Sequence, residues 1–110
     1  MSQQTQIGKP ILVLDAADTD AFEVMNALIS ETRMRMLEYL GGRLANVSEI
    51  ATALDIPLST ANLHLGKLED AGLITTELKT ASRGVQKVCA RRYDHISVQF
   101  PTQTYTETES

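Results

Sequence analysis

The sequence predicts an α+β fold in which a bundle of short helices is followed by a β-hairpin, with an extra short strand expected near each end. Two observations predict this fold. Between about residues 22 and 71, apolar residues recur at the three-to-four-residue spacing of amphipathic helices. After Gly72 the spacing changes to the alternation of strands, and "TASRG", 80–84, divides two alternating runs with a turn signal. The 110 residues suffice for one domain with one core.

The N-terminal part begins with "ILVLD", 11–15, a short apolar run that we read as a strand or docking arm. Asp20 followed by Glu23 matches a capping box, which would open a helix. This helix carries more apolar residues than one short core needs, so we expect it to make a two-fold dimer contact. The residues concerned are Phe22, Met25 and Ile29.

The second and third helices are predicted from their ends. Ser30 would cap "ETRMRMLEYL", 31–40, and Gly41-Gly42 would stop it. Asn46 with Glu49 forms another cap pair before a short apolar helix. "DIPL", 55–58, reads as a tight turn, because Pro57 disfavours helical backbone at the residue before it. The residues expected to face the core are Met34, Leu37 and Leu40 on the second helix, and Val47, Ile50, Ala51 and Leu54 on the third.

The fourth helix, 59–71, has one core stripe and one unusually bare face. Ser59 is expected to cap it, and Ala61, Leu65 and Leu68 have the spacing of a core stripe. The opposite face carries only small, polar or exposed apolar residues, with a glycine that costs about 1 kcal/mol relative to alanine. These residues are Ser59, Asn62, Leu63 and Gly66.

The C-terminal part is predicted to form a hairpin from "LITTELK" and "VQKVCAR", followed by one more strand over Ile96, Val98 and Phe100. Residues 101–110 are rich in Thr, Ser and Glu and read as a disordered tail or linker. The expected domain boundaries are therefore an N-terminal arm or strand at 1–15, the folded domain at 16–100, and the tail at 101–110.

Charge is distributed unevenly along the chain. The net charge is −4, which by itself argues against a nucleic-acid partner. Residues 33–92 nevertheless carry a net +3, and 79–92 holds five bases without an acid. Local charge matters more for binding a polyanion, because physiological salt screens charges more than about 8 Å apart. The five bases are Lys79, Arg83, Lys87, Arg91 and Arg92.

This order of elements is that of a winged helix-turn-helix. A helix that enters the DNA major groove needs one packed face and one face of short side chains that lets base edges approach. Ser59, Thr60 and Asn62 are short hydrogen-bonding residues, and Leu63 could meet a thymine methyl. Lys67 at the flank suits a phosphate contact, as do Lys79, Arg83, Lys87 and Arg91 in and after the hairpin. Since adjacent strand residues point to opposite faces, at most one of Arg91 and Arg92 would face DNA.

The sequence resembles the ArsR family of regulators over about residues 22–92. "SETRMRMLEYL", 30–40, resembles the family's Ser-x-x-Arg start of a Leu-rich helix. "VSEIATALDIPLSTANLHLGKLEDAGLI", 47–74, resembles its helix-turn-helix. The resemblance implies a cytoplasmic prokaryotic transcription regulator, usually a repressor, that binds operator double-stranded DNA as a homodimer. It places Ser59, Thr60, Asn62 and Leu63 at base-reading positions, and Arg83 and Lys87 in the wing.

Two departures from that family pattern limit what carries over. The short helix before the turn, "VSEIATAL", lacks the Cys-x-Cys pair of metal sensors. With one cysteine and two distant histidines, we expect no metal site and no cofactor. A strand pattern, "YDHISVQF", replaces the usual dimerising helix, which suits the DNA-binding domain of a longer regulator with a C-terminal effector domain.

Other classes are weighed against this reading. The sequence lacks catalytic motifs, an apolar run long enough to span a bilayer, and a signal peptide, so we expect a cytoplasmic non-enzyme. One rival is a winged helix that binds protein, which the overall acidity favours. A second is a thiol-responsive regulator, because cations beside Cys89 could activate its thiol, although a buried structural cysteine is expected more often. His64 borders the core stripe and is expected to be packed or hydrogen-bonded.

Overall fold

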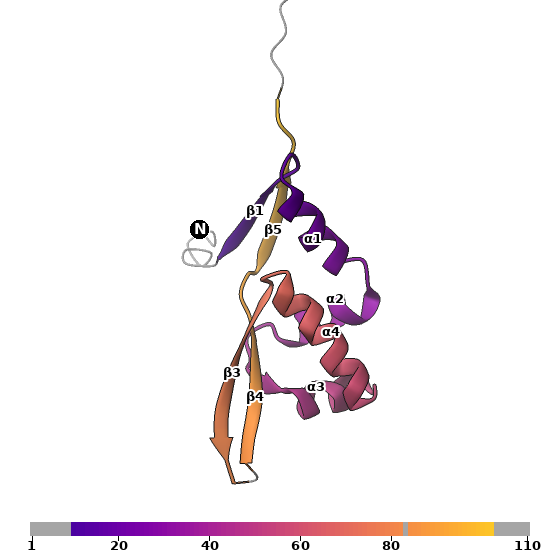
Figure 1. The fold of residues 1–110 in the computed structure, drawn as a ribbon, viewed down its shortest axis with the longest axis vertical. Coiled ribbons are helices and arrows are strands. Elements are labelled where there is room, and N and C mark those ends of the chain that lie inside the picture. The colour runs from indigo at the N-terminus through magenta and orange to yellow at the C-terminus, as the bar shows by residue number, and fades with distance from the viewer. Residues whose placement is uncertain (1–9, 83, 103–110) are drawn as a thin grey trace, which may run out of the picture.

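The computed structural model describes residues 10–82 and 84–102. Helices form one lobe, a long hairpin runs along it, and a two-stranded sheet lies beside the first helix (Figure 1). Within the described ranges no helix is long and apolar enough to cross a membrane. In chain order the elements are β1 (Ile11–Asp15), α1 (Thr19–Ala27), α2 (Glu31–Tyr39), β2 (Ala45–Asn46), α3 (Val47–Leu54), α4 (Leu58–Asp70), β3 (Ile74–Ala81), β4 (Gly84–Arg91) and β5 (His95–Gln99).

The predicted capping box of α1 is wrong. The turn before the helix is closed by the backbone amide of Asp18, which donates to the Asp15 carbonyl at 2.9 Å. Asp18 therefore becomes the N-cap, without a side-chain capping bond, and the helix starts at Thr19. A capping-box carboxylate must stand at the third helical position, and Glu23 lies beyond that position.

Helix α2 keeps its predicted cap, but its predicted core face is partly wrong. The Ser30 hydroxyl accepts a hydrogen bond from the Arg33 amide at 3.2 Å, and Leu40 is buried as expected. Met34, predicted to face inward, is 50% exposed, whereas Met36 is fully buried. The buried face of α2 differs from the predicted one because it includes Arg33. This residue lies next to α1, where its guanidinium donates to backbone carbonyls.

The helix-turn-helix itself follows the sequence closely. Asn46 and Glu49 form the predicted capping box, with both reciprocal bonds at 2.8 Å. Asp55 ends α3 in the left-handed conformation at φ 57° and starts the turn. One detail of the prediction is wrong: Pro57, not Ser59, is the N-cap of α4, because its extended backbone already offers its carbonyl to the Ala61 amide at 3.0 Å.

The core lies between the helices and one face of the hairpin. The predicted stripe of α4 is confirmed, since Ala61, Leu65 and Leu68 have no exposed surface. Residues from the other helices and the hairpin close this core around α4. They are Ala21, Val24, Ala27, Met36, Leu40, Ile50, Ala51, Leu54, Leu73, Ile74 and Cys89.

The hairpin is longer than predicted and has a third strand that the sequence did not predict. β3 and β4 pair antiparallel from Ile74↔Arg91 to Ala81↔Gly84, so the strands extend into the segment read as a turn. β2 adds to the other edge of β4 through Ala45↔Cys89 and gives the order β2-β4-β3. Gly72, at φ +77°, provides the left-handed backbone between α4 and this sheet.

The strands expected at the two ends are confirmed and pair with each other. β1 and β5 run parallel, in register from Ile11↔His95 to Asp15↔Gln99. Leu14 is buried in the core, so residues 11–15 are an integrated strand rather than a loose arm. Phe100 lies just beyond β5 and is 75% exposed. Residues 1–9 and 103–110, most of the predicted arm and tail, fall outside the described residues.

Candidate nucleic-acid interface

The bare face of α4 is exposed along the helix. Ser59, Asn62 and Leu63 are all exposed, and Leu63 keeps 60% of its surface. A Cβ added at Gly66 would meet no atom within 4 Å, so the glycine opens the middle of this face to the outside. The spacing of these residues places them on one side of the helix. This side offers a hydroxyl, an amide and an apolar contact without a long side chain to keep a partner away.

Two further predicted residues lie on the flank of α4 rather than on this face. Thr60 is half-buried, and Lys67 is exposed. Lys67 borders a shallow hollow of about 190 Å³ between α1 and α4 that is also lined by Glu23 and Asp70. Acidic neighbours on this side reduce the positive potential that Lys67 can offer to a phosphate.

His64 has the structural role that its position predicted. Its Nδ1 lies 2.9 Å from Nη1 of Arg33, whose Nε donates to the Ala27 carbonyl at 2.6 Å and whose Nη2 donates to the Asn26 carbonyl at 3.4 Å. An arginine has only donors, so His64 must accept through Nδ1. Burial, followed by the charges of Arg33 and Lys67, lowers the pKa of His64 below its ordinary 6.5. The neutral imidazole thus joins α4 to Arg33 of α2, and Arg33 in turn is bonded to the end of α1.

The two described lysines of the hairpin differ in their surroundings. Lys79 is exposed and lies 3.7 Å from Glu77, in an ion pair whose side chains are 51% and 75% exposed. Water and salt weaken such a pair to a negligible contribution. Lys87 lies 3.4 Å from Glu69 of α4, in a more sheltered pair. Arg83, the predicted base at the hairpin tip, lies outside the described residues.

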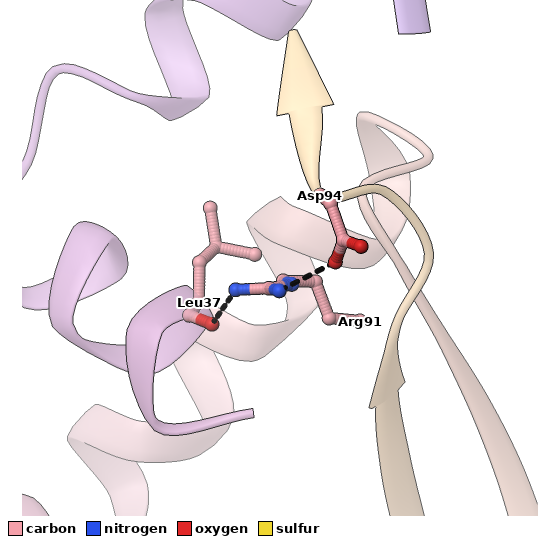
Figure 2. Close-up of polar contacts among 3 residues, drawn as sticks. All are labelled: Leu37, Arg91 and Asp94. Carbon is pink, nitrogen blue, oxygen red and sulfur yellow. Dashed lines mark hydrogen bonds and ion pairs between the residues drawn. The ribbon is translucent and has the colours of Figure 1, made fainter. Parts of the chain in front are cut away.

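The hydrogen bonds of Arg91 within the protein argue against its predicted contact with a phosphate. Its Nη1 donates to the Leu37 carbonyl at 3.1 Å, and its Nη2 bonds Asp94 at 2.6 Å (Figure 2). The guanidinium also fills the space beside Gly41, where an added Cβ would lie 2.9 Å from Nη1. Arg91 therefore ties the base of the hairpin to α2 and to the segment before β5. With its guanidinium held in this way, Arg91 is not proposed as a DNA contact.

Cys89 and the two histidines do not assemble a reactive or metal-binding site. Cys89 is fully buried, and burial raises the pKa of its thiol, outweighing the opposite effect of Lys87. A thiol so protected is a poor redox sensor, because the thiolate is the reactive form. Among the described residues, no group of three or more His, Cys, Asp or Glu side chains could hold a metal ion.

Glu69 is a candidate functional residue that the sequence reasoning missed. Its carboxylate contacts both strands of the hairpin, through Thr76 at 2.6 Å and Lys87 at 3.4 Å. In the sequence Glu69 looks like one exposed charge near a helix end. Only the packing of α4 against the hairpin brings these three side chains together.

A family model described as a helix-turn-helix domain matches residues 28–77. This range begins at the end of α1 and reaches into β3, so it includes α3, the turn and α4. No curated protein matches the chain.

Solved structures show the same fold. An ArsR family transcriptional regulator is 32% identical, with 66% of this chain and 75% of that chain covered and a TM-score of 0.58. A homodimeric winged helix-turn-helix DNA-binding domain from Mycobacterium bovis, a possible ArsR-family regulator, is 25% identical, with 70% and 68% covered and a TM-score of 0.61. Reduced HlyU from Vibrio cholerae is 21% identical, with 84% and 83% covered and a TM-score of 0.61, and supports the fold alone.

Proposed function

This chain belongs to the ArsR family of transcriptional regulators, and we propose that it binds operator DNA as a homodimer with α4 in the major groove. The helix-turn-helix and the family make it a DNA-binding regulator rather than an enzyme. The proposal also includes the base-reading residues of α4, the homodimer and a repressor role. The expectation that an effector domain follows residue 110 stays a prediction.

The observation that supports this proposal most strongly is the bare face of α4. Ser59 and Asn62 carry short donors and acceptors that can reach base edges only if the helix axis lies close to the groove floor. Gly66 leaves open space where a side chain would keep the helix away. Leu63, 60% exposed on this face, suits the methyl group of thymine.

The hairpin supplies the proposed backbone contacts. Lys79 is exposed, and its pair with Glu77 is weak enough for a phosphate to displace. Arg83 lies outside the described residues and stays a predicted contact, because it belongs to the run "TASRG" that the sequence predicts as the turn. Contacts with phosphates set position and affinity, whereas contacts with base edges set specificity.

The homodimer is proposed from the exposed face of α1. Phe22 is 61% exposed and Ile29 is 75% exposed, and both line one open hollow with the half-buried Met25. Ile29, predicted to lie on this helix, follows its C-cap Leu28 instead. Apolar side chains gathered in this way commonly mark an interaction surface. The similar domain from Mycobacterium bovis is described as homodimeric, which supports the same state here.

Selection of bound sequences from a random duplex pool tests the proposal. We expect an enriched palindrome whose half-sites are one helical turn apart, about 34–36 Å, because a two-fold dimer presents two copies of α4. An enriched single half-site would contradict the dimer. A pool without enrichment would contradict sequence-specific recognition. A reporter gene behind the selected site then tests repression, which should lower its expression.

A second candidate function is a winged helix that binds a protein. The net charge of −4 and the neutralisation of Lys87 by Glu69 favour it. A gel shift with random duplex separates the two candidates. A DNA-binding protein should bind in a salt-sensitive manner, whereas a protein adaptor should not bind.

A further inference from the structure

One carboxylate joins the proposed recognition helix to both strands of the hairpin. Glu69 lies near the C-terminal end of α4. Its Oε2 accepts a hydrogen bond from the Thr76 hydroxyl of β3 at 2.6 Å, and its Oε1 lies 3.4 Å from Nζ of Lys87 on β4. Thr76 is paired with Cys89 and Leu78 with Lys87, so both partners lie on the hairpin face that carries the buried Cys89. Lys87 is thus held by a residue of the reading helix itself.

We propose that Glu69 limits the sequence-independent affinity of this protein for DNA, because it occupies Lys87 and withholds this cation from the DNA backbone. The inference rests on the proposed function. It also changes the role predicted for Lys87 from a phosphate contact to the partner of an internal carboxylate.

The physical reason lies in how cations bind DNA. Each lysine that neutralises a phosphate releases condensed counterions and adds about 0.9 to the slope of log affinity against log salt. This gain is the same for every sequence, so it strengthens binding to random DNA as much as to the operator. A lysine that stays with a carboxylate adds nothing to either. The Glu69 pair therefore lowers the affinity for every duplex by the same factor and lowers its salt dependence, while the ratio of specific to random affinity stays unchanged.

Glu69 is well suited to compete with a phosphate for Lys87. The Thr76 bond holds one carboxylate oxygen, which orients the other toward Nζ of Lys87. The same bond, together with Lys87, lowers the pKa of Glu69, so the carboxylate is ionised at neutral pH. The two side chains are 34% and 41% exposed, against 51% and 75% for Lys79 and Glu77. Water and salt therefore weaken the Glu69 pair less than its neighbour.

The test is a salt titration of random and selected duplexes with Glu69→Gln. Glutamine keeps an oxygen that can accept from Thr76 but loses the charge that holds Lys87. We expect tighter binding to random and selected duplexes by the same factor, a salt slope steeper by about one on both, and an unchanged ratio of specific to random affinity. The double variant Glu69→Gln with Lys87→Gln should return the slope to the wild-type value.

Glu31→Gln is the matched control. Glu31 is exposed at the start of α2 and has no ion pair among residues 10–82 and 84–102. Its substitution removes the same charge without releasing a lysine. It should leave the salt slope at the wild-type value, which separates the release of Lys87 from a general reduction of acidity.

Three results would overturn the inference. An unchanged slope for Glu69→Gln would mean that the freed lysine does not reach a phosphate. A slope that falls by about one in Lys87→Gln alone would mean that Lys87 already leaves Glu69 for DNA in the wild type. Equal slope changes for Glu69→Gln and Glu31→Gln would mean that the change in net charge alone, rather than the release of Lys87, alters the slope. If the wild type itself fails to bind DNA in a salt-sensitive manner, the proposed function fails as well.

Discussion

Arg33 is a buried cation whose described hydrogen-bond partners are uncharged. It is 9% exposed, and its guanidinium donates to two carbonyls at the end of α1 and to His64. Arginine stays charged at any pH a protein tolerates, so His64 beside it must stay neutral for the contact to persist. The Arg of the Ser-x-x-Arg start therefore couples the position of α4 to the protonation state of one histidine.

This coupling predicts a loss of stability in acid that depends on His64. The folded protein has a lowered pKa at His64, so the unfolded chain binds more protons below the ordinary value of 6.5. Stability from this group is complete above that value and is lost as the pH falls below it. Urea unfolding midpoints from about pH 7.5 to about pH 5 should therefore fall more steeply for the wild type than for His64→Gln. Parallel curves would contradict the role of His64.

Asn62 should affect specificity without affecting general affinity. As a base-reading residue it discriminates between sequences, so Asn62→Ala should weaken binding to the selected site by about 1–3 kcal/mol and leave random duplex nearly unchanged. Binding titrations on both duplexes measure this. Gln99→Ala, which removes an amide from exposed β5, is the control and should change neither affinity. If Asn62→Ala left the affinity for the selected site unchanged, this face would not read DNA.

Residues of the candidate site could be predicted only where the local spacing of apolar residues determines which side of a helix they occupy. The alternation of core and bare faces places Ser59, Asn62 and Leu63 outside the core, and the structure leaves all three exposed. The bases of the hairpin could not be assigned in this way. Lys87 and Arg91 differ from Lys79 only in what α4 and α2 place beside them.

At the scale of elements, helix α4 carries a glycine that serves its surface rather than its stability. Glycine in mid-helix is unfavourable relative to alanine, and an alanine methyl at Gly66 would meet no neighbour in the protein. The glycine is therefore unexplained by folding. A close approach of DNA to the helix would explain it.

Gly66→Ala should consequently have opposite effects on stability and binding. We expect the free energy of unfolding to rise by about 0.5–1 kcal/mol, because alanine loses less backbone entropy and has space for its methyl group. Affinity for the selected duplex should fall, because the methyl group stands where the DNA must come close. Thermal unfolding and a binding titration on one preparation measure both. Undiminished affinity would show that DNA does not approach α4 at Gly66.

Elements defined by neighbouring residues could be predicted, and elements defined by distant partners could not. The capping box joins Asn46 to Glu49, only three positions later in the sequence, and it is confirmed. β2 has only two residues and exists because Ala45 meets Cys89 of β4, a contact without a signal in the sequence of either segment. The parallel partnership of β1 and β5 was equally hidden, although both strands were expected.

At the scale of the whole molecule, the exposed face of α1 makes the oligomeric state testable. Phe22→Glu should convert the expected dimer to a monomer, because a charge would be buried without a partner at the two-fold contact. Sedimentation equilibrium measures the change, and binding to a palindromic site should weaken with it. Leu44→Glu is the control, since Leu44 is similarly exposed, at 62% against 61%, but lies outside α1. A wild type that sediments as a monomer at tens of micromolar would contradict the dimer.

The pairing of β1 with β5 has a consequence for the order in which the chain becomes structured during synthesis. β1 leaves the ribosome before every other described element, whereas its partner β5 leaves after all of them. Until then the run "ILVL" has no strand beside it, and an unpaired apolar strand is prone to pair with other nascent chains. The helix-turn-helix can form before β5 emerges, whereas the burial of Leu14 is completed only afterwards. Co-translational folding of this domain is therefore completed by the pairing of its first strand with its last.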